Sequence, residues 1–186
     1  MDFYKVLETR TSIKKFKTDQ VREESIGKMI NAAMLSPSWK NNTSYKFIIV
    51  DDQRIREKLG ETINNDTEDA QRAITDAPIT AIVVGNPSES GQINGKDFYL
   101  VDAAIAMEHF ILAATNEGYG TCWIASFDEN KIKNILGIPK EYKVIAITPI
   151  GVTEEAKNHY PMKPVDSHIY LNNWENEYSR KNLVMS

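Results

Sequence analysis

Apolar side chains recur in several segments at the spacing of one helix face. The clearest segment has them at offsets of 0, 3, 4, 7 and 8, namely Ile26, Met29, Ile30, Ala33 and Met34. This spacing predicts an amphipathic helix over residues 22–36, which Pro37 ends because proline cannot continue a helix. Further helices are predicted over residues 2–9, 52–62 and 128–136.

Strands are predicted where short runs of β-branched and aromatic residues lie between turn residues. These runs cover residues 45–50, 79–84, 121–125 and 142–150. Since they alternate with the predicted helices, the sequence indicates a fold of mixed α and β structure. Residues 86–97 hold Asn, Pro, Ser and Gly without periodicity, so they are predicted to form a long mobile loop, of a kind that often acts as a lid.

The longest predicted helix, over residues 97–117, is apolar on more than one side and is followed by Gly118. A single subunit of this size would have difficulty covering such a helix, so we expect it to lie at or near a subunit interface. Beyond Gly151 the periodicity is lost, and the aromatic segment 168–178 is expected to be an arm that leaves its own subunit. Without internal repeats, residues 1–186 are expected to form a single domain.

The composition is that of an ordinary globular protein. Of the 186 residues, 41% are hydrophobic, which is enough apolar material for one compact core. With 22 basic and 26 acidic residues the net charge is −4, so the overall field does not favour a nucleic acid partner. A single cysteine can form neither an internal disulfide nor a Cys-rich zinc site.

The sequence also predicts a location. The chain opens with Asp-Phe-Tyr-Lys at positions 2–5, in place of the basic and apolar regions of a secretion signal. No stretch approaches the roughly 18 uninterrupted apolar residues of a membrane span, since even the most apolar segment holds Glu108 and Glu117. We therefore expect a cytoplasmic protein without a membrane segment.

Several common catalytic motifs do not occur in the sequence. It contains no Gly-x-x-x-x-Gly-Lys phosphate loop, no Gly-x-Ser-x-Gly elbow and no His-Glu-x-x-His, and its three histidines lack the spacing of metal ligands. Gly118-Tyr119-Gly120 lies between a predicted helix and a following strand, the reverse of the order in a dinucleotide-binding fingerprint. Hydrolytic and metal-dependent chemistry are therefore not favoured.

A basic cluster lies near the N-terminus. From Lys5 to Lys17, five basic residues accompany one acidic residue, a local charge of +4 in a chain of net charge −4. If the segment is extended, Arg10, Ser12 and Lys14 share one face. A guanidinium fork, a hydroxyl and an ammonium together suit a ligand that has a phosphate and neighbouring polar oxygens. The alternative is a basic face that is simply solvated.

Two further clusters adjoin predicted strands. Residues 36–45 place amide and hydroxyl donors between a helix end and a strand, although a plain connecting loop also explains them. Residues 118–125 hold two glycines and the small Ala125, which would let the backbone approach a flat ligand. Cys122 has no evident activating base nearby and is interpreted as an inert buried thiol. His109, in the apolar helix, is interpreted as a hydrogen-bonded core or interface residue.

In this order, the clusters resemble the motifs of the flavin-dependent nitroreductase family over nearly the whole chain. Residues 10–16, Arg-Thr-Ser-Ile-Lys-Lys-Phe, resemble the opening Arg-Arg-Ser-Ile-Arg-x-Phe of that family. Residues 37–41, Pro-Ser-Trp-Lys-Asn, resemble its Pro-Ser-x-x-Asn-x-Gln-Pro-Trp loop. Residues 118–125 resemble its Gly-Leu-Gly-Thr-Cys-Trp-Ile-Gly stretch, and residues 161–164, Pro-Met-Lys-Pro, resemble a late basic motif that returns to the phosphate.

The resemblance implies an FMN site in which the loop at 37–41 reaches the flavin across a dimer. The implied cofactor-binding residues are Arg10, Thr11, Ser12, Lys14, Pro37, Ser38, Trp39, Asn41, Thr43, Trp123, Ile124, Ala125 and Lys163. Lys14 is expected to stabilise the negative charge of reduced flavin, so no side-chain nucleophile and no metal are needed.

The chain departs from the family motifs at three places. Thr11 replaces the second arginine of the opening motif. Residues 43–45, Thr-Ser-Tyr, stand where Gln-Pro-Trp is common. Met162 stands where an arginine is frequent, which leaves Lys163 as the late cation for the phosphate. These changes are expected to alter affinity or substrate choice rather than to abolish binding.

The resemblance further implies a fold and an activity. The fold is an α+β, nitroreductase-like homodimer with a central, mainly antiparallel sheet flanked by helices and with exchanged C-terminal arms. The activity is that of an FMN-dependent NAD(P)H oxidoreductase, which reduces nitroaromatics, quinones or related acceptors by ping-pong hydride transfer through flavin N5. The alternatives are a flavin reductase or dehalogenase-like enzyme on the same scaffold, a flavin-binding protein without substantial turnover, and an interaction domain without a cofactor.

Overall fold

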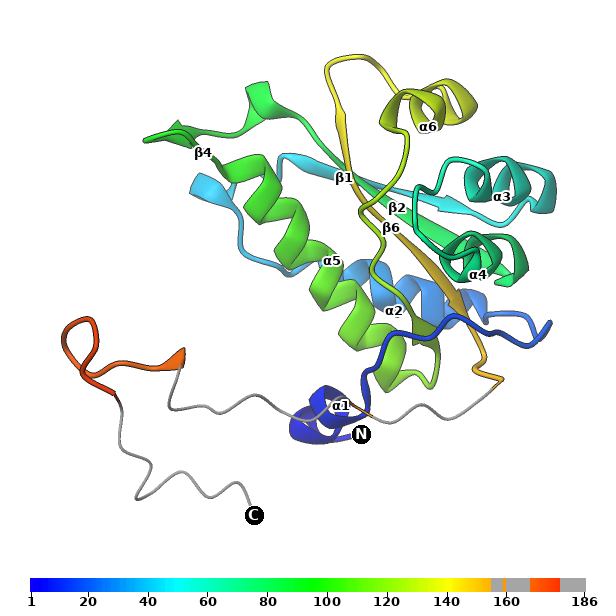
Figure 1. Cartoon of the computed structure of the whole chain (residues 1–186), viewed down its shortest axis with the longest axis horizontal. Coiled ribbons are helices and arrows are strands. Elements are labelled where there is room, and N and C mark those ends of the chain that lie inside the picture. The colour runs from blue at the N-terminus through cyan, green and yellow to red at the C-terminus, as the bar shows by residue number, and fades with distance from the viewer. Residues whose placement is uncertain (155–158, 160–167, 178–186) are drawn as a thin grey trace.

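The computed structural model describes residues 1–154, 159 and 168–177, and a four-stranded antiparallel sheet lies at its centre (Figure 1). In the order in which they lie side by side, the strands are β1 (Tyr45–Val50), β2 (Ile79–Gly85), β6 (Lys143–Gly151) and β5 (Gly120–Thr121). The helices are α1 (Phe3–Thr9), α2 (Glu23–Met34), α3 (Gln53–Gly60), α4 (Asp69–Asp76), α5 (Phe98–Asn116) and α6 (Glu129–Leu136). The expected α+β fold, an antiparallel sheet flanked by helices, is confirmed.

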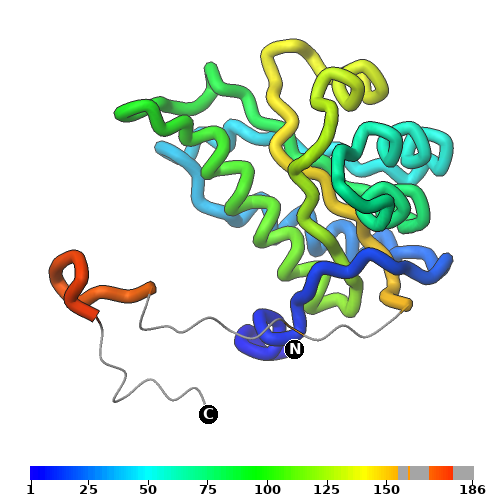
Figure 2. The backbone as a smooth tube through the Cα atoms, in the orientation of Figure 1, coloured from blue at the N-terminus to red at the C-terminus, as the bar shows by residue number. Residues whose placement is uncertain are grey.

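Helices cover both faces of the sheet (Figures 1 and 2). On one face α2 and α5 pack against the strands, with Met29 and Phe110 fully buried. On the other face α3, α4 and α6 pack against them, with Leu59 and Ile132 fully buried. The central strand β2 is therefore buried at every position, which explains why its sequence is a continuous run of apolar and small residues.

The long helix α5 has 19 residues, and Ala103, Ala106 and Phe110 on it are fully buried. Within the described part of the chain, it is the helix whose length and apolar composition would suffice to cross a membrane. Its packing against α2 and the sheet accounts for that composition. Leu100 and Val101 near its N-terminal end are still 43% and 46% exposed, so this chain alone does not cover it all round. The expected subunit interface at this helix stays a prediction.

Short acidic side chains fix the starts of three helices. Asp2, Asp52 and Asp128 each accept a hydrogen bond from the backbone N–H three residues later, at 3.0, 3.0 and 3.1 Å. α6 ends at Gly137, whose φ of 64° is a left-handed conformation that glycine adopts without steric cost. The helices predicted over 2–9, 22–36, 52–62 and 128–136 are confirmed, with ends that differ by one or two residues.

The prediction of a long loop over residues 86–97 is wrong in so far as the segment contains regular elements, and its mobility stays a prediction. These residues contain the 3₁₀ turn η2 (Pro87–Glu89) and a small hairpin of β3 (Gln92–Ile93) and β4 (Lys96–Asp97). The hairpin turn is Asn94-Gly95, and both residues have positive φ, which the tight turn requires. Strands of two residues are too short to produce a recognisable alternation.

The prediction of a strand over 121–125 is wrong in its length. β5 ends at Thr121, and Ile124 forms a single bridge with Ile147. Between these pairs, the Cys122 N–H donates to Thr148 Oγ1 at 3.2 Å in place of a backbone carbonyl, which interrupts the ladder. The helix α4 was not predicted, because its buried residues are few and two of them are alanines.

Residues 168–177 form a small loop that lies apart from the sheet and helices in Figure 1. The Leu171 N–H donates to the Asn176 carbonyl at 2.8 Å, and the rings of Tyr170 and Trp174 lie 4.8 Å apart. Trp174 is 78% exposed. The expected exchange of a C-terminal arm with a second subunit stays a prediction.

Candidate functional site

The basic segment after α1 is extended and lies along β5. Ser12 and Thr121 form a parallel bridge, and the Ile13 N–H donates to the Thr121 carbonyl at 2.8 Å. Ile13 is buried, whereas Ser12 and Lys14 on either side of it are half-buried. The extended backbone thus turns the apolar residue inward and the two polar residues the other way. It also brings the first and third sequence clusters side by side.

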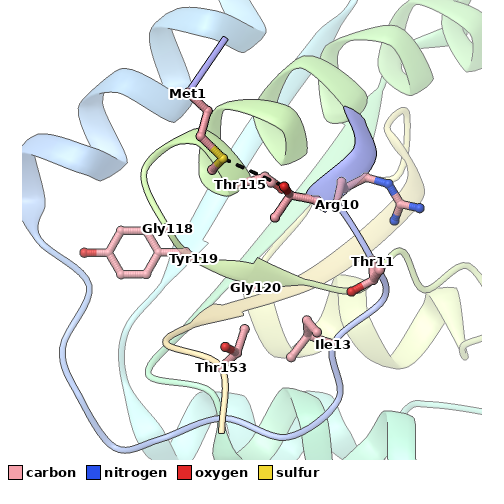
Figure 3. Close-up of a pocket in the computed structure, with 10 residues that line it drawn as sticks. Met1, Arg10, Thr11, Ile13, Thr115, Gly118, Tyr119, Gly120 and Thr153 are labelled. Carbon is pink, nitrogen blue, oxygen red and sulfur yellow. Dashed lines mark hydrogen bonds between the residues drawn. The ribbon is translucent and has the colours of Figure 1, made fainter. Parts of the chain in front are cut away.

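A pocket of about 270 Å³ opens where this segment meets the C-terminal end of α5 (Figure 3). Its lining residues are Met1, Thr9, Arg10, Thr11, Ile13, Thr115, Gly118, Tyr119, Gly120 and Thr153. Arg10 is the one charged side chain in this lining, which includes no carboxylate. A positive pocket in a chain of net charge −4 suits an anionic ligand.

The cations of the basic segment differ in their surroundings. Lys14 Nζ lies 4.0 Å from Asp69 Oδ2, and both side chains are partly exposed, at 34% and 66%. An exposed pair of this length contributes little and can be replaced by a ligand. Arg10 forms no ion pair with the described residues, and its guanidinium points away from Tyr119 in Figure 3. Thr11, which lies between these two cations in the sequence, lines the pocket together with Arg10.

The two glycines at the pocket have different roles. Gly118 has a φ of 88°, which closes the turn after α5. At Gly120, an added Cβ would lie 2.6 Å from Thr153 Cγ2 and 2.9 Å from Ile13 Cβ. The expectation that both glycines make room for a flat ligand is therefore corrected for Gly120, since its close neighbours belong to the chain itself.

A polar cluster behind the pocket holds the start of α2 against the end of α5. Glu117 Oε2 accepts hydrogen bonds from Ser25 Oγ at 2.9 Å and Lys28 Nζ at 3.2 Å, and these bonds lower the pKa of Glu117. Burial raises the pKa of Tyr119, but hydrogen bonds from the backbone and side chain of Arg22 outweigh it, so the pKa is lowered overall. The cluster fixes the Tyr119 side of the pocket.

The second sequence cluster forms a tightly built loop around η1 (Trp39–Asn41), which follows α2. Lys40, Asn41 and Thr43 have φ values of 49°, 58° and 50°, a conformation that is uncommon outside glycine. The Thr43 N–H donates to Ser38 Oγ at 3.0 Å. Pro37 precedes the loop and is exposed. Strained backbone of this kind persists only where the surrounding structure holds it.

Asp102 holds this loop, and its role was not predicted from the sequence. The side chain is 2% exposed, and its Oδ1 accepts the Trp39 N–H at 2.7 Å. Its Oδ2 accepts the Ser44 and Ser90 hydroxyls at 3.0 and 3.3 Å. The available signal was an aspartate among apolar residues near the start of the most apolar helix, since a buried charge requires specific hydrogen-bond partners.

Within one chain, the pocket and the loop lie at opposite ends of α5. The Trp39 ring stacks on Phe98 at the start of α5, with ring centres 4.0 Å apart, whereas Thr115 near its end lines the pocket. A rise of about 1.5 Å per residue separates these ends by about 25 Å. Figure 1 shows α5 as one continuous helix between these two ends. The structure therefore brings residues 10–14 and 118–121 together but leaves residues 37–43 elsewhere.

The other predicted site residues, Ser12 and Lys14 among them, are not part of the pocket lining. Ile124 is buried, and Trp123 and Ala125 on either side of it are exposed, Trp123 by 38%. Cys122 is buried as expected. Lys163 lies outside the described residues, as does the late basic motif at 161–164. His109 Nδ1 lies 3.2 Å from the Ala32 carbonyl, in agreement with the interpretation of a hydrogen-bonded core histidine.

Metal ligands do not gather in the part of the chain that the structure describes. There, no group of three or more His, Cys, Asp and Glu side chains could hold an ion.

Comparison with known proteins identifies the class to which this fold and pocket belong. The profile of the Nitroreductase family matches residues 7–78 and 65–152 of the chain, so the chain belongs to the nitroreductase family, a family of oxidoreductases. A protein of Methanothermobacter thermautotrophicus, provisionally named NADH dehydrogenase/NAD(P)H nitroreductase, is 30% identical over 178 residues, which cover 94% of this chain and 88% of that protein.

Solved structures agree with this assignment. A nitroreductase family protein from Clostridium novyi is 45% identical, with a TM-score of 0.82, and the match covers 98% of this chain and all of the other. An FMN-dependent nitroreductase from Clostridium difficile is 28% identical, with a TM-score of 0.77 and a match over 91% of this chain and 98% of its own.

Proposed function

We propose that this protein is an FMN-dependent NAD(P)H oxidoreductase that reduces nitroaromatics, quinones or related acceptors. The observation that carries the proposal is the positive pocket without carboxylates, lined by Arg10 and residues 118–120 among others, in a chain of the nitroreductase family. The FMN-dependent nitroreductase from Clostridium difficile supports the choice of cofactor. The expected location is the cytoplasm.

The residues present fit the anionic end of FMN. A phosphate requires positive charge and hydrogen-bond donors, and the pocket offers Arg10 together with hydroxyls of Thr11 and Thr153. The Arg10 guanidinium has no ion-pair partner among the described residues, so a phosphate would not have to displace one. Lys163 is proposed as a second cation for the phosphate.

We further propose that two copies of the chain share each site. Residues 37–43 and the pocket lie about 25 Å apart within one chain, so both can contact one ligand only if the loop comes from a partner. Leu100 and Val101 next to this loop are exposed apolar residues, which supports a homodimer interface there.

The chemistry divides between cofactor and protein. When bound, FMN supplies the ring system that accepts a hydride and passes electrons on. The Lys14 ammonium is proposed to offset the negative charge that this reaction builds up, because fixed positive charge acts without reorganisation. Arg10 is proposed to anchor the phosphate, and the donor and acceptor are expected to use one site in turn, with ping-pong kinetics.

The absorption spectrum of the purified protein, recorded anaerobically before and after NADH or NADPH, tests the proposal. A flavin band that bleaches within the turnover time supports an enzyme. A band that persists indicates a passive flavin-binding protein, and a colourless protein that takes up no added FMN contradicts the proposal. Steady-state assays with nitroaromatics, quinones, free flavin and halogenated aromatics then distinguish a nitroreductase from a flavin reductase or a dehalogenase-like enzyme.

Replacing Arg10 tests the phosphate assignment. A hydrogen bond to a charged group contributes roughly 1.5 to 3 kcal/mol, so Arg10→Ala is expected to raise the Kd of FMN by about 10-fold to 100-fold. Quenching of flavin fluorescence during titration of the apoprotein measures this change. Arg54→Ala, at an exposed arginine on α3, is the matched control and should bind FMN as the wild type does. Wild-type affinity in Arg10→Ala would contradict the assignment.

A further inference from the structure

Asp102 connects two segments that are distant in sequence. Its carboxylate accepts the Trp39 N–H at 2.7 Å and the Ser44 hydroxyl at 3.0 Å, which come from opposite ends of the η1 loop (residues 38–44). It also accepts the Ser90 hydroxyl at 3.3 Å, from the segment between β2 and α5. A carboxylate that is 2% exposed requires such donors, so the three bonds are mutually dependent.

Ring packing strengthens the same connection. The Trp39 indole stacks on Phe98 at an interplanar angle of 14°. On the side of the hairpin segment, a Cβ added to Gly91 would lie 2.4 Å from Trp39 Nε1, so only a glycine fits there. Asn42 Nδ2 also donates to the Glu89 carbonyl at 3.1 Å. The η1 loop and residues 89–98 therefore form one packed unit with Asp102 at its base.

The backbone of the η1 loop depends on these contacts. Lys40, Asn41 and Thr43 have positive φ, and such residues relax toward commoner conformations when their surroundings no longer hold them. The Trp39 N–H lies directly before the strained residues, so its bond to Asp102 fixes where the strained part starts. The hydrogen bond from the Thr43 N–H to Ser38 Oγ holds the other end of this strained part.

We propose that Asp102 is a positioning residue, which holds the η1 loop and the hairpin segment in the one arrangement that can meet the cofactor pocket of a second copy. This inference rests on the proposed function, because it assigns a use to the loop at a shared FMN site. Asp102 itself lies under the loop and is buried, so it acts through Trp39, Ser44 and Ser90 rather than on the ligand.

Asp102→Asn is the direct test. The asparagine side chain keeps the shape of aspartate, but it has no charge and carries an NH2 donor in place of one of the two acceptor oxygens. Hydrogen exchange of the backbone amides in the apoprotein is expected to become at least 10-fold faster in residues 38–44 and 88–92. Exchange in the four-stranded sheet should stay unchanged. The Kd of FMN is expected to rise by about 10-fold, and the visible absorption band of bound FMN is expected to shift, because the loop no longer presents fixed polar groups to it.

Asp128→Ala is the control for a general loss of stability. It removes the N-cap of α6, on the other face of the sheet, and should lower the melting temperature by several degrees. Exchange in the η1 loop, the Kd of FMN and the absorption band should stay as in the wild type.

Each result is decisive. If Asp102→Asn exchanges at the wild-type rate in the η1 loop, or exchanges faster but binds FMN with wild-type affinity and spectrum, the inference is wrong and the proposed function stands. If the wild type binds no FMN, the proposed function and this inference fail together. If Asp102→Asn does not fold, Ser44→Ala and Ser90→Ala take its place, with smaller changes in the same direction expected; wild-type behaviour of both would overturn the inference.

Discussion

Gly120 packs so closely against the N-terminal segment that no side chain fits at this position. An added Cβ would come within 2.6 Å of Thr153 Cγ2 and 2.9 Å of Ile13 Cβ. Gly120→Ala should therefore push the basic segment away from β5, at a cost of about 1 to 3 kcal/mol in the free energy of unfolding. Urea-induced unfolding followed by circular dichroism measures the change.

Gly27 is the matched control for this substitution. It lies inside α2 and has no atom within 4 Å of an added Cβ. Gly27→Ala should raise the free energy of unfolding by about 0.5 to 1 kcal/mol, because alanine loses less backbone entropy in a helix. If the two variants have equal stability, the close approach at Gly120 does not occur in solution.

The helices α2 and α5 are joined by a charge cluster that depends on pH. Hydrogen bonds from Ser25 and Lys28 hold the pKa of Glu117 below its ordinary value of 4.5. A carboxylate whose pKa is lower in the folded state stabilises the fold above its unfolded-state pKa, and this stabilisation is lost as the pH falls through the folded-state pKa. The contact between the two helices should therefore weaken in acid.

Glu117→Gln tests this pH dependence. The wild type should be more stable than the variant at neutral pH, and the difference should disappear as the pH is lowered step by step below 4.5. Urea unfolding at each pH measures it. Glu8→Gln is the control, because Glu8 and its partner Lys5 are both largely exposed and should give no such trend. A difference independent of pH would assign the role of Glu117 to packing instead of charge.

The elements that the sequence predicts best are those with a strong internal signal. The strand at 45–50 is found with the predicted limits, since its apolar run lies between turn residues. The helix with Ile26, Met29 and Ala33 on one side has a full amphipathic stripe and a proline after it. In such segments local preference and tertiary burial agree.

The elements that the sequence misses depend on tertiary contacts. α4 buries only Ala70, Ala73 and Ile74, too few apolar residues for a visible stripe. β5 stops because the side chain of Thr148 takes the hydrogen bond that would otherwise extend the ladder. Neither cause leaves a periodic pattern in the neighbouring sequence.

The separation of the loop and the pocket in one chain leads to a prediction for the assembled protein. If a partner completes each site, Arg10→Ala and Trp39→Ala damage different contributors to it. A mixed dimer of the two variants then contains one intact site and one doubly altered site. Co-expression of both variants in equal amounts should restore about a quarter of the wild-type activity, as measured by NAD(P)H oxidation with a quinone.

Co-expression of the Arg10→Ala variant with a separate Lys14→Ala variant is the control for this experiment. Both residues lie on the same segment, so each mixed dimer has an altered residue in both sites and no recovery is expected. Recovery with this control pair, or none with the first pair, would contradict a shared site. The mass of the purified protein in solution should at the same time correspond to two chains.

The sequence alone predicted part of the candidate site and missed the rest for a definite reason. The sequence selected residues 10–14 and 118–125 as separate clusters and did not predict that the first lies along β5, which the structure shows. The place of Trp39 follows from Asp102, Gly91 and Phe98, which no motif relates to it. Buried hydrogen bonds between distant residues depend on the fold, and local sequence carries no sign of the partner.

The burial of Cys122 makes this protein convenient for site-specific labelling. Cys122 is the single cysteine in the sequence and is 5% exposed, so reagents for thiols should reach no native position in the folded protein. A cysteine introduced at Ile93, which is 46% exposed at the tip of the hairpin, would offer the one accessible attachment point. A spin label or fluorophore there would follow the hairpin without removal of any native thiol.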